Sequence, residues 1–241
     1  MKVGDQITVR IENMSLHGGG VARHEGFVFF VDFTAPGDSA LVEITELKKN
    51  YGFARLAQLL TPSPERKNPP CPVFGRCGGC NWQHLSEESQ TAWKERLVRE
   101  ALGKAWPREF QFLPIVKSPK TFRYRNRIQL KKKGNKVGYF AAGTHDLVDI
   151  QDCPLAEERL VPLIEELRQR PESRKHQKHT HGAENWELSL TEDHQGQIRS
   201  LDQRDLAFSQ VNRFINELLI QEVLDWSAER PFGTFWDLYC G

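Results

Sequence analysis

The sequence predicts an α+β chain of several domains that opens with a small, OB-like β-barrel and continues into a central mixed α/β region. Two observations support this prediction. Short, apolar-alternating segments separated by turn signals fill residues 2–60, a spacing typical of small barrels. A helical pattern and further strand patterns then follow a cysteine-rich loop. The 241 residues are enough for two or three compact domains, each with its own core.

The barrel prediction, residues 1–60, depends on four segments. In "QITVRI" the apolar residues Ile7, Val9 and Ile11 share one face, and "GFVFFVDF" is almost continuously apolar. "ALVEITEL" alternates again and "GFARLAQLL" closes the set, while "HGGG" and "APGD" supply turns. The next ten residues, "TPSPERKNPP", contain four prolines, which exclude a helix interior and a central strand. We therefore interpret residues 61–70 as a linker.

The second predicted region, residues 61–104, contains this linker, a cysteine loop and one helix. Ser86 is the expected N-cap, followed by two acidic residues that favour the positive end of a helix dipole. Trp93, Leu97 and Ala101 recur at helical spacing, and Gly103 is expected to end the helix.

Three cysteines lie within the ten residues of "CPVFGRCGGC". The spacing Cys71-x5-Cys77-x2-Cys80 places three thiols on one tight, glycine-containing loop, which favours a metal site. A closed site needs a fourth ligand. His84 would complete a Cys3His zinc site, whereas Cys153 would complete an all-cysteine site better suited to iron and sulfide. The spacing alone leaves both open, and unliganded cysteines remain a third possibility.

The third predicted region, residues 105–205, is notable for positive charge. Nine Lys and Arg residues and no acidic residue lie between Lys117 and Lys136, although the whole chain has a net charge of only +1. In "TFRYRNRIQL", strand periodicity places the three arginines on one face and the apolar residues on the other. A lysine-rich loop then forms a hairpin with "VGYF". We interpret this as an RNA-binding stripe rather than a solvated face; its residues are Arg123, Arg125, Arg127, Lys131, Lys132 and Lys133.

The last predicted region, residues 206–241, begins with a helix whose apolar face contains Val211, Phe214, Ile215, Leu218 and Leu219. It ends with "FWDLYCG", which resembles the first strand and cofactor loop of a Rossmann-like domain. A lone first strand would expose an unpaired edge. We therefore expect the chain to be the amino-terminal part of a longer protein, with a truncated Rossmann-like domain.

Taken in order, these segments resemble bacterial RNA (uracil-5)-methyltransferases, most closely the branch that modifies a uridine of 23S ribosomal RNA. The stretch from "GDQITVRIENM" to "YGFARL" looks like the family's TRAM domain, and "CPVFGRCGGCNWQHL" looks like its cluster motif. "QDCPL" matches the place of its fourth cysteine. "FSQVN" and "DLYCG" match the entry to the methyltransferase domain and its first cofactor motif.

The resemblance implies a 4Fe–4S cluster on Cys71, Cys77, Cys80 and Cys153. It also implies S-adenosylmethionine contacts at Gln210 and Tyr239, and an RNA contact at Phe208. In the family, a cysteine thiolate adds to C6 of uracil, C5 takes the methyl group, and a carboxylate removes the C5 proton. Those two catalytic groups lie beyond Gly241 in relatives, and Cys240 does not match the nucleophile. We therefore expect this chain to bind S-adenosylmethionine poorly and to transfer no methyl group.

The leading hypothesis is the RNA-recognition half of a uridine methyltransferase, with 23S ribosomal RNA as partner and a structural cluster. Methyl transfer from a sulfonium needs no electron, and Cys153 would fill the iron position that radical chemistry leaves open. The alternatives are a self-standing RNA-binding module with a structural metal site, and a zinc-stapled protein-interaction module. The opening "MKVGDQITVR" has no apolar signal region, and no apolar run approaches ~18 residues. We expect a cytoplasmic monomer that contacts no membrane.

Overall fold

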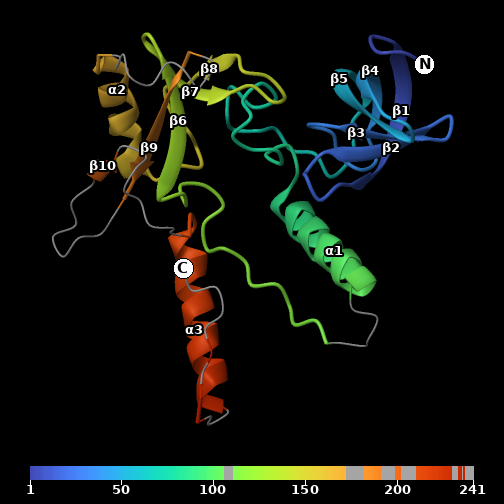
Figure 1. Cartoon of the computed structure of the whole chain (residues 1–241). Helices are drawn as coiled ribbons and strands as arrows, with labels where there is room; N and C mark the ends of the chain where they lie inside the picture. Colours follow the sequence, from blue (N-terminus) through green and yellow to red (C-terminus); the bar gives the residue numbers. More distant parts are fainter. Residues whose placement is uncertain are drawn as a thin grey trace.

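Two β-sheets organise the chain, and the loop that carries the first three cysteines lies between them (Figure 1). The structure, a computed structural model, describes residues 1–105, 111–171, 182–190, 199–201 and 210–229, together with positions 233, 234 and 236. No helix within these ranges is long and apolar enough to cross a lipid bilayer.

The first sheet is a closed barrel with strand order β1-β2-β3-β5-β4, which confirms the predicted N-terminal barrel. Its neighbouring strands are antiparallel, except that β3 and β5 run parallel where the barrel closes. Val9 and Ile11 point into the core as the alternating pattern predicted, and Phe29 is fully buried beside them. The strands are β1 (Gln6–Met14), β2 (Gly20–His24), β3 (Phe27–Val31), β4 (Ser39–Leu47) and β5 (Tyr51–Thr61).

The proline-rich segment that follows is fastened to the barrel by a buried carboxylate. Asp38 has no exposed side-chain surface and accepts two hydrogen bonds from Arg66, from Nε at 2.8 Å and from Nη2 at 2.7 Å. It also accepts the backbone N–H of Ala35 at 2.6 Å and that of Ser63 at 2.8 Å. After Thr61, the last residue of β5, the segment contains no strand or helix, as predicted, but its first half packs against the barrel.

Helix α1 (Glu87–Ala105) begins where the sequence predicted. The Ser86 hydroxyl accepts the N–H of Ser89 at 3.1 Å, which is the geometry of an N-cap. Trp93 is buried and packs with Met14 and Leu85, with Leu97 at the edge of this small cluster. The predicted end was wrong, because the helix continues through Gly103 to Ala105; the exposed Ala101 contributes nothing to the buried face.

The second sheet has strand order β10-β9-β6-β7-β8, and each of its pairings is antiparallel. The predicted hairpin is present, since β6 turns into β7 at Gly134, whose φ of 57° suits a residue without a Cβ. Helix α2 covers one face and buries Ile164 and Leu167 against the strands. The elements are β6 (Arg127–Lys133), β7 (Lys136–Phe140), β8 (Leu147–Asp149), η1 (Glu158–Leu160), α2 (Val161–Gln169), β9 (Glu184–Ser189) and β10 (Arg199–Leu201).

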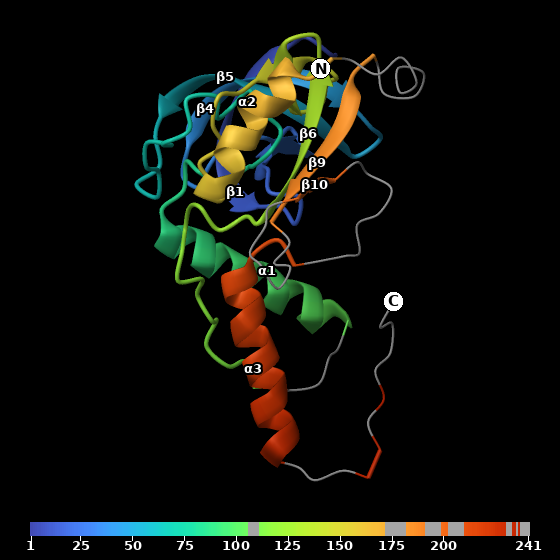
Figure 2. The same cartoon turned by 90° about the vertical axis from the view of Figure 1, so that its left-hand side faces the viewer.

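Helix α3 (Arg213–Glu229) extends away from both sheets in Figures 1 and 2. Of the predicted apolar face, Phe214 and Ile215 are half-buried near the start of the helix, whereas Leu218 and Leu219 are exposed. None of the α3 residues is buried by the described part of the chain. The predicted strand in "FWDLYCG" lies largely outside the described residues.

The Asp38–Arg66 pair should dominate the attachment of the linker to the barrel. Replacing Asp38 by Asn leaves a mostly buried guanidinium without its carboxylate, which should lower the free energy of unfolding by about 3 kcal/mol. Burial alone would raise the pKa of Asp38, but Arg66 and the two backbone N–H groups outweigh it and hold the pKa below its ordinary value. The stabilisation should therefore be present above pH about 4 and be lost as the pH falls.

Urea unfolding as a function of pH checks this prediction. The matched control is Glu43→Gln, which removes the carboxylate from the exposed Arg55–Glu43 pair in the same barrel and should cost at most about 1 kcal/mol. Equal losses in the two variants, or an acid-side slope unchanged by Asp38→Asn, would contradict the assigned role.

Candidate metal centre and nucleic-acid cleft

The loop of residues 71–80 is fixed against the second sheet by its backbone. The Gly78 N–H donates to the Phe140 carbonyl at 2.9 Å, and Cys77 forms a β-bridge with Ala141 just past the end of β7. A Cβ on Gly78 would come within 2.8 Å of that carbonyl oxygen, so only glycine permits this approach. The Cys77 N–H also donates to the Val73 carbonyl at 3.0 Å, which tightens the loop.

Cys153 reaches the same place from the connection between β8 and η1. Cys71, Cys77, Cys80 and Cys153 are all free thiols, and all four line one small cavity together with Val73, Tyr139 and Leu155. The resemblance to the methyltransferase family implied this set of four; the structure brings them together from segments more than 70 residues apart.

His84, the alternative fourth ligand, lies elsewhere. It is not part of the cavity lining; its ring packs against that of Phe74, tilted by 34° with centroids 5.5 Å apart. Burial lowers its pKa to about 4, and Arg66 and Asp38 are its charged neighbours. Of the two alternatives that spacing left open, Cys153 shares the cavity with the three loop cysteines and His84 does not. The identity of a fourth ligand stays a prediction.

The thiols are buried and receive hydrogen bonds. Burial raises the pKa of Cys77, and it raises that of Cys80 to about 11, so both are neutral at pH 7 without a ligand. The Gly79 N–H donates to Cys77 Sγ at 3.4 Å and Gln83 Nε2 donates to Cys80 Sγ at 3.1 Å. Such donors stabilise thiolates once a metal has displaced the protons.

The cavity offers four cysteine thiols as its donor set. Within the described ranges, no three His, Cys, Asp or Glu side chains come close enough to hold one metal ion. Tetrahedral zinc, with Zn–S bonds of about 2.3 Å, needs sulfurs only about 4 Å apart. A cubane places its own irons and sulfides between the four cysteines, so four thiols around an open cavity fit that donor arrangement.

A larger cleft of about 830 Å³ adjoins the cysteine cavity. Its wall combines the β1–β2 turn of the barrel, helix α1, the cysteine loop and the segment 115–125. Gly79, Cys80, Gln83 and Leu155 line both the cleft and the cysteine cavity, so the two share a wall. The cationic residues of the cleft are Lys67, Lys94, Lys117, Lys120 and Arg125, and its aromatic residues are Trp82, Phe122 and Tyr124.

The predicted arginine stripe is wrong as a strand face. Strand β6 begins only at Arg127, and the chain turns at Arg123, whose φ is +55°. Arg123 donates to both carboxylate oxygens of Asp152, at 2.7 and 2.5 Å, and to the Cys153 carbonyl at 3.1 Å. Arg127 forms an ion pair with the buried Glu187. Arg123 thus holds the Cys153 segment in place. Arg127 neutralises the carboxylate of Glu187 on the neighbouring strand β9.

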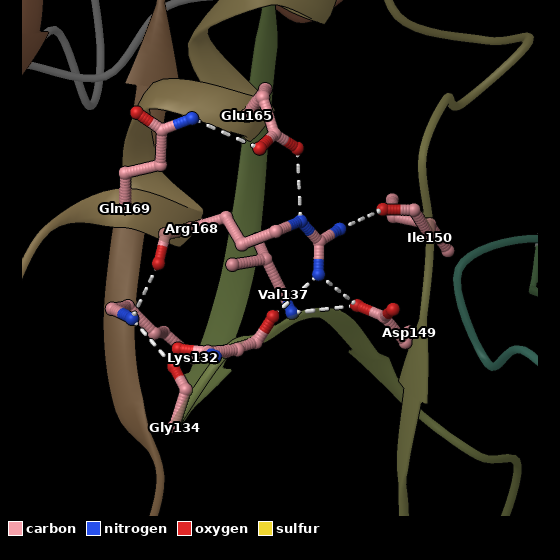
Figure 3. A network of polar contacts seen from close by, with 9 residues as sticks. Lys132, Gly134, Val137, Asp149, Ile150, Glu165, Arg168 and Gln169 are labelled. Atoms are coloured by element: carbon pink, nitrogen blue, oxygen red, sulfur yellow. Dashed lines mark hydrogen bonds and ion pairs between the residues drawn. The ribbon is translucent and has the colours of Figure 1, made fainter.

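The lysine loop also differs from the prediction. Lys132 is buried, and its Nζ donates to the Gly134 carbonyl at 2.6 Å and the Arg168 carbonyl at 3.2 Å, within the network shown in Figure 3. Lys131 contacts Asn185 and lies 5.5 Å from the ring centroid of Phe140. Lys133 alone of the three is exposed. A lysine in a strand can point inward when nearby carbonyls accept hydrogen bonds from its ammonium group, a possibility that charge counting overlooked.

The cofactor residues implied by the resemblance are only partly described. Gln210 is exposed just before α3, next to Val211, whose carbonyl accepts the Asn126 N–H at 3.1 Å. Tyr239 and Phe208 lie outside the described residues. The sequence prediction missed the cleft lysines Lys67 and Lys94 and the aromatic Trp82, because no single strand or helix brings them together.

Comparison with known proteins matches the chain to a TRAM domain and to RNA methyltransferases. The TRAM domain family model matches residues 1–57. An uncharacterized RNA methyltransferase of Bdellovibrio bacteriovorus is 43% identical over 244 residues, which is 99% of this chain and 61% of that protein. The 23S rRNA (uracil(1939)-C(5))-methyltransferase RlmD of Pectobacterium atrosepticum is 39% identical over 171 residues, 67% of this chain and 37% of its own length.

A solved structure, the Pyrococcus abyssi tRNA (uracil-54, C5)-methyltransferase in complex with S-adenosyl-L-homocysteine, shares the fold. The TM-score is 0.62 at 20% sequence identity, covering 90% of this chain and 64% of that one. The chain spans between 36% and 61% of the length of these and other curated relatives that it matches. The chain therefore carries a TRAM domain and belongs to the RNA (uracil-5)-methyltransferase family, whose amino-terminal portion it matches.

Proposed function

We propose that this chain is the RNA-recognition portion of an S-adenosylmethionine-dependent ribosomal RNA uridine-C5 methyltransferase. The observation that carries the proposal is the cleft between the TRAM barrel and the cysteine loop, because it gathers five cationic and three aromatic side chains. The five cations outnumber the two carboxylates of the lining, Glu87 and Glu88, so the net charge is suited to phosphates. The aromatic faces are suited to unpaired bases. The relative named as a 23S ribosomal RNA methyltransferase supports ribosomal RNA as the partner.

Within the cleft, the segment 115–125 offers the most accessible positive charge. Lys117 and Lys120 are both exposed, and Lys120 Nζ lies 4.7 Å from the ring centroid of Phe214. Lys67 is less free, because it already pairs with Glu87 at 3.6 Å. We assign Lys117 and Lys120 to backbone phosphates, which fix the position of RNA without selecting its sequence.

The four-cysteine cavity is proposed to hold a 4Fe–4S cluster. Bound there, the cluster would supply covalent crosslinking of the 71–80 loop to the Cys153 segment. The chain's own residues prepare the cavity: Arg123 anchors the Cys153 carbonyl, and Gly79 and Gln83 donate hydrogen bonds to sulfur. Since residues of this cavity also form the cleft wall, the proposed role is to shape the RNA surface.

The methyl-transfer activity proposed for the whole protein rests on the family. Gln210, exposed just before α3, is the described residue we assign to the cofactor. Together with Tyr239, which lies outside the described residues, it would contact S-adenosylmethionine. The described residues would bind and orient the RNA so that one uridine is presented for methylation.

The metal assignment makes a quantitative prediction. After anaerobic reconstitution with iron and sulfide, the chain should hold about four irons and absorb broadly near ~400 nm, as a cubane on four thiolates does. Cys153→Ser should lower iron content as far as Cys77→Ser does, because the two thiols line the same cavity. Iron and sulfide analysis with the visible spectrum measures both.

His84→Ala is the matched control, because His84 is the other candidate ligand and lies outside the cavity lining. It should retain the iron. If the iron instead survives Cys153→Ser and is lost from His84→Ala, the fourth ligand is the histidine.

The cleft assignment predicts a change in the salt dependence of RNA binding. Replacing Lys117 and Lys120 together by Ala should weaken binding to a 23S ribosomal RNA fragment. The slope of log K against log salt should flatten by about 1.4–1.8, since each lost phosphate contact contributes about 0.7–0.9. Filter binding or fluorescence anisotropy over a salt series measures the slope.

The control variant replaces Lys133 and Lys136, two exposed lysines of the β6–β7 hairpin that do not line the cleft. Its slope should equal that of the unmodified chain. A flattened slope in the hairpin variant together with an unchanged slope in the cleft variant would contradict the assignment. It would indicate that the hairpin lysines, and not the cleft lysines, contact the RNA phosphates.

A further inference from the structure

Asn212, the residue just before helix α3, connects this helix to the segment that carries Lys117 and Lys120. Its side-chain Oδ1 accepts the N–H of Ile215 at 3.3 Å, which is the geometry of an N-cap. Its Nδ2 donates to Ser118 Oγ at 3.0 Å, 94 residues earlier in the chain. One amide group therefore caps the helix and reaches the cleft, whose wall includes both Asn212 and Ser118.

The surroundings of the Ser118 hydroxyl fix the direction of this contact. A serine hydroxyl carries a single proton, and that of Ser118 is donated to the Lys120 carbonyl at 2.7 Å. The same oxygen accepts the Lys120 N–H at 3.3 Å. Toward Asn212 the hydroxyl can therefore act only as an acceptor, so the contact needs a side chain that brings an N–H donor to this point.

The segment around Ser118 has little other support. Within the described residues 113–121, Ser118 is half-buried and the others are exposed, and none belongs to a helix or strand. Lys120 also lies over the ring of Phe214 at 4.7 Å, but its ammonium is the group proposed to bind phosphate. The Ser118 contact is thus a link to α3 that can persist when RNA occupies the cleft.

The other end of the link is firmly held. Asn212 forms a β-bridge with Arg125. The next residue, Arg213, forms an ion pair with the buried carboxylate of Glu157 at 2.8 Å. Asn212 therefore joins a well-supported position at the start of α3 to an exposed segment that bears two lysines.

We propose that Asn212 is a positioning residue that holds residues 117–120 in the conformation that binds RNA. This rests on the proposed RNA cleft. Gln210 precedes Asn212 by two positions, so the same residue would set the lysines relative to the residue assigned to the cofactor. Without the Ser118 contact both lysine charges remain, but the segment must become ordered when RNA binds, which costs affinity.

The first test is Asn212→Ser, because serine caps a helix as well as asparagine does and its shorter side chain does not reach Ser118. A 23S ribosomal RNA fragment should bind about 3- to 10-fold more weakly, the effect of ordering one further long side chain. The slope of log K against log salt should stay unchanged, since no phosphate contact is removed. Fluorescence anisotropy over a salt series measures both. The matched control, Asn216→Ser, makes the same substitution one turn further along α3, outside the cleft lining, and should bind like the unmodified chain.

Two more variants separate positioning from helix capping. Ser118→Ala removes the acceptor at the other end and should weaken binding to a similar extent. Adding Asn212→Ser to it should cause less than about a 2-fold further loss, because one contact cannot be removed twice. Asn212→Ala removes the cap as well as the link. If capping alone mattered, Asn212→Ala would weaken binding and Asn212→Ser would not.

Unchanged affinity in Asn212→Ser would overturn the inference, as would losses that simply add in the double variant. A salt slope flattened by Asn212→Ser would also overturn it, because the lysines would then have lost their phosphates. If replacing Lys117 and Lys120 leaves the slope unchanged, the proposed RNA cleft fails, and the role of Asn212 fails with it. If that replacement flattens the slope while Asn212→Ser binds normally, only the role of Asn212 is refuted.

Discussion

The convergence of two distant segments on one sulfur-lined cavity is the constraint on which the rest of the arrangement depends. The 71–80 loop is held by the Gly78 to Phe140 hydrogen bond, and the Cys153 segment is held by Arg123. The cavity lies at the edge of the core of the second sheet, because Ile150 belongs to that core and Val73, Tyr139 and Cys153 pack against it. Thiols bound to a metal there would tie the 71–80 loop to this core.

The same location explains why the cleft and the cavity share residues. Gly79, Cys80, Gln83 and Leu155 each contribute to both surfaces. A displacement of the loop would change the cleft wall directly, without any change in the barrel or in the second sheet. Under the proposed function, the cysteine centre and the RNA surface would be parts of one structural unit, which would give a cluster a non-redox role.

The sequence was most informative where local pattern decides structure. The alternating apolar residues of β1 and the apolar run of β3 predicted the barrel correctly, and Ser86 predicted the start of α1 correctly. The sequence-based prediction failed where contacts between distant segments decide the local structure. Period-two counting placed Arg123 and Arg125 on a strand face, but carbonyls of the Cys153 segment draw this stretch out of the sheet. Lys132 likewise turns inward because the backbone carbonyls of Gly134 and Arg168 accept hydrogen bonds from its ammonium group. The four cysteines came from family resemblance, since spacing could not exclude His84.

Hydrogen exchange of the metal-loaded chain, with and without a 23S ribosomal RNA fragment, tests the central claim most directly. If the cysteine loop and the cleft form one RNA-binding unit, RNA should slow amide exchange in residues 78–83 and 115–125 together. The β6–β7 hairpin, Arg127–Phe140, should be unaffected outside its contacts with the loop. Protection confined to that hairpin, or no protection in residues 78–83, would contradict the account.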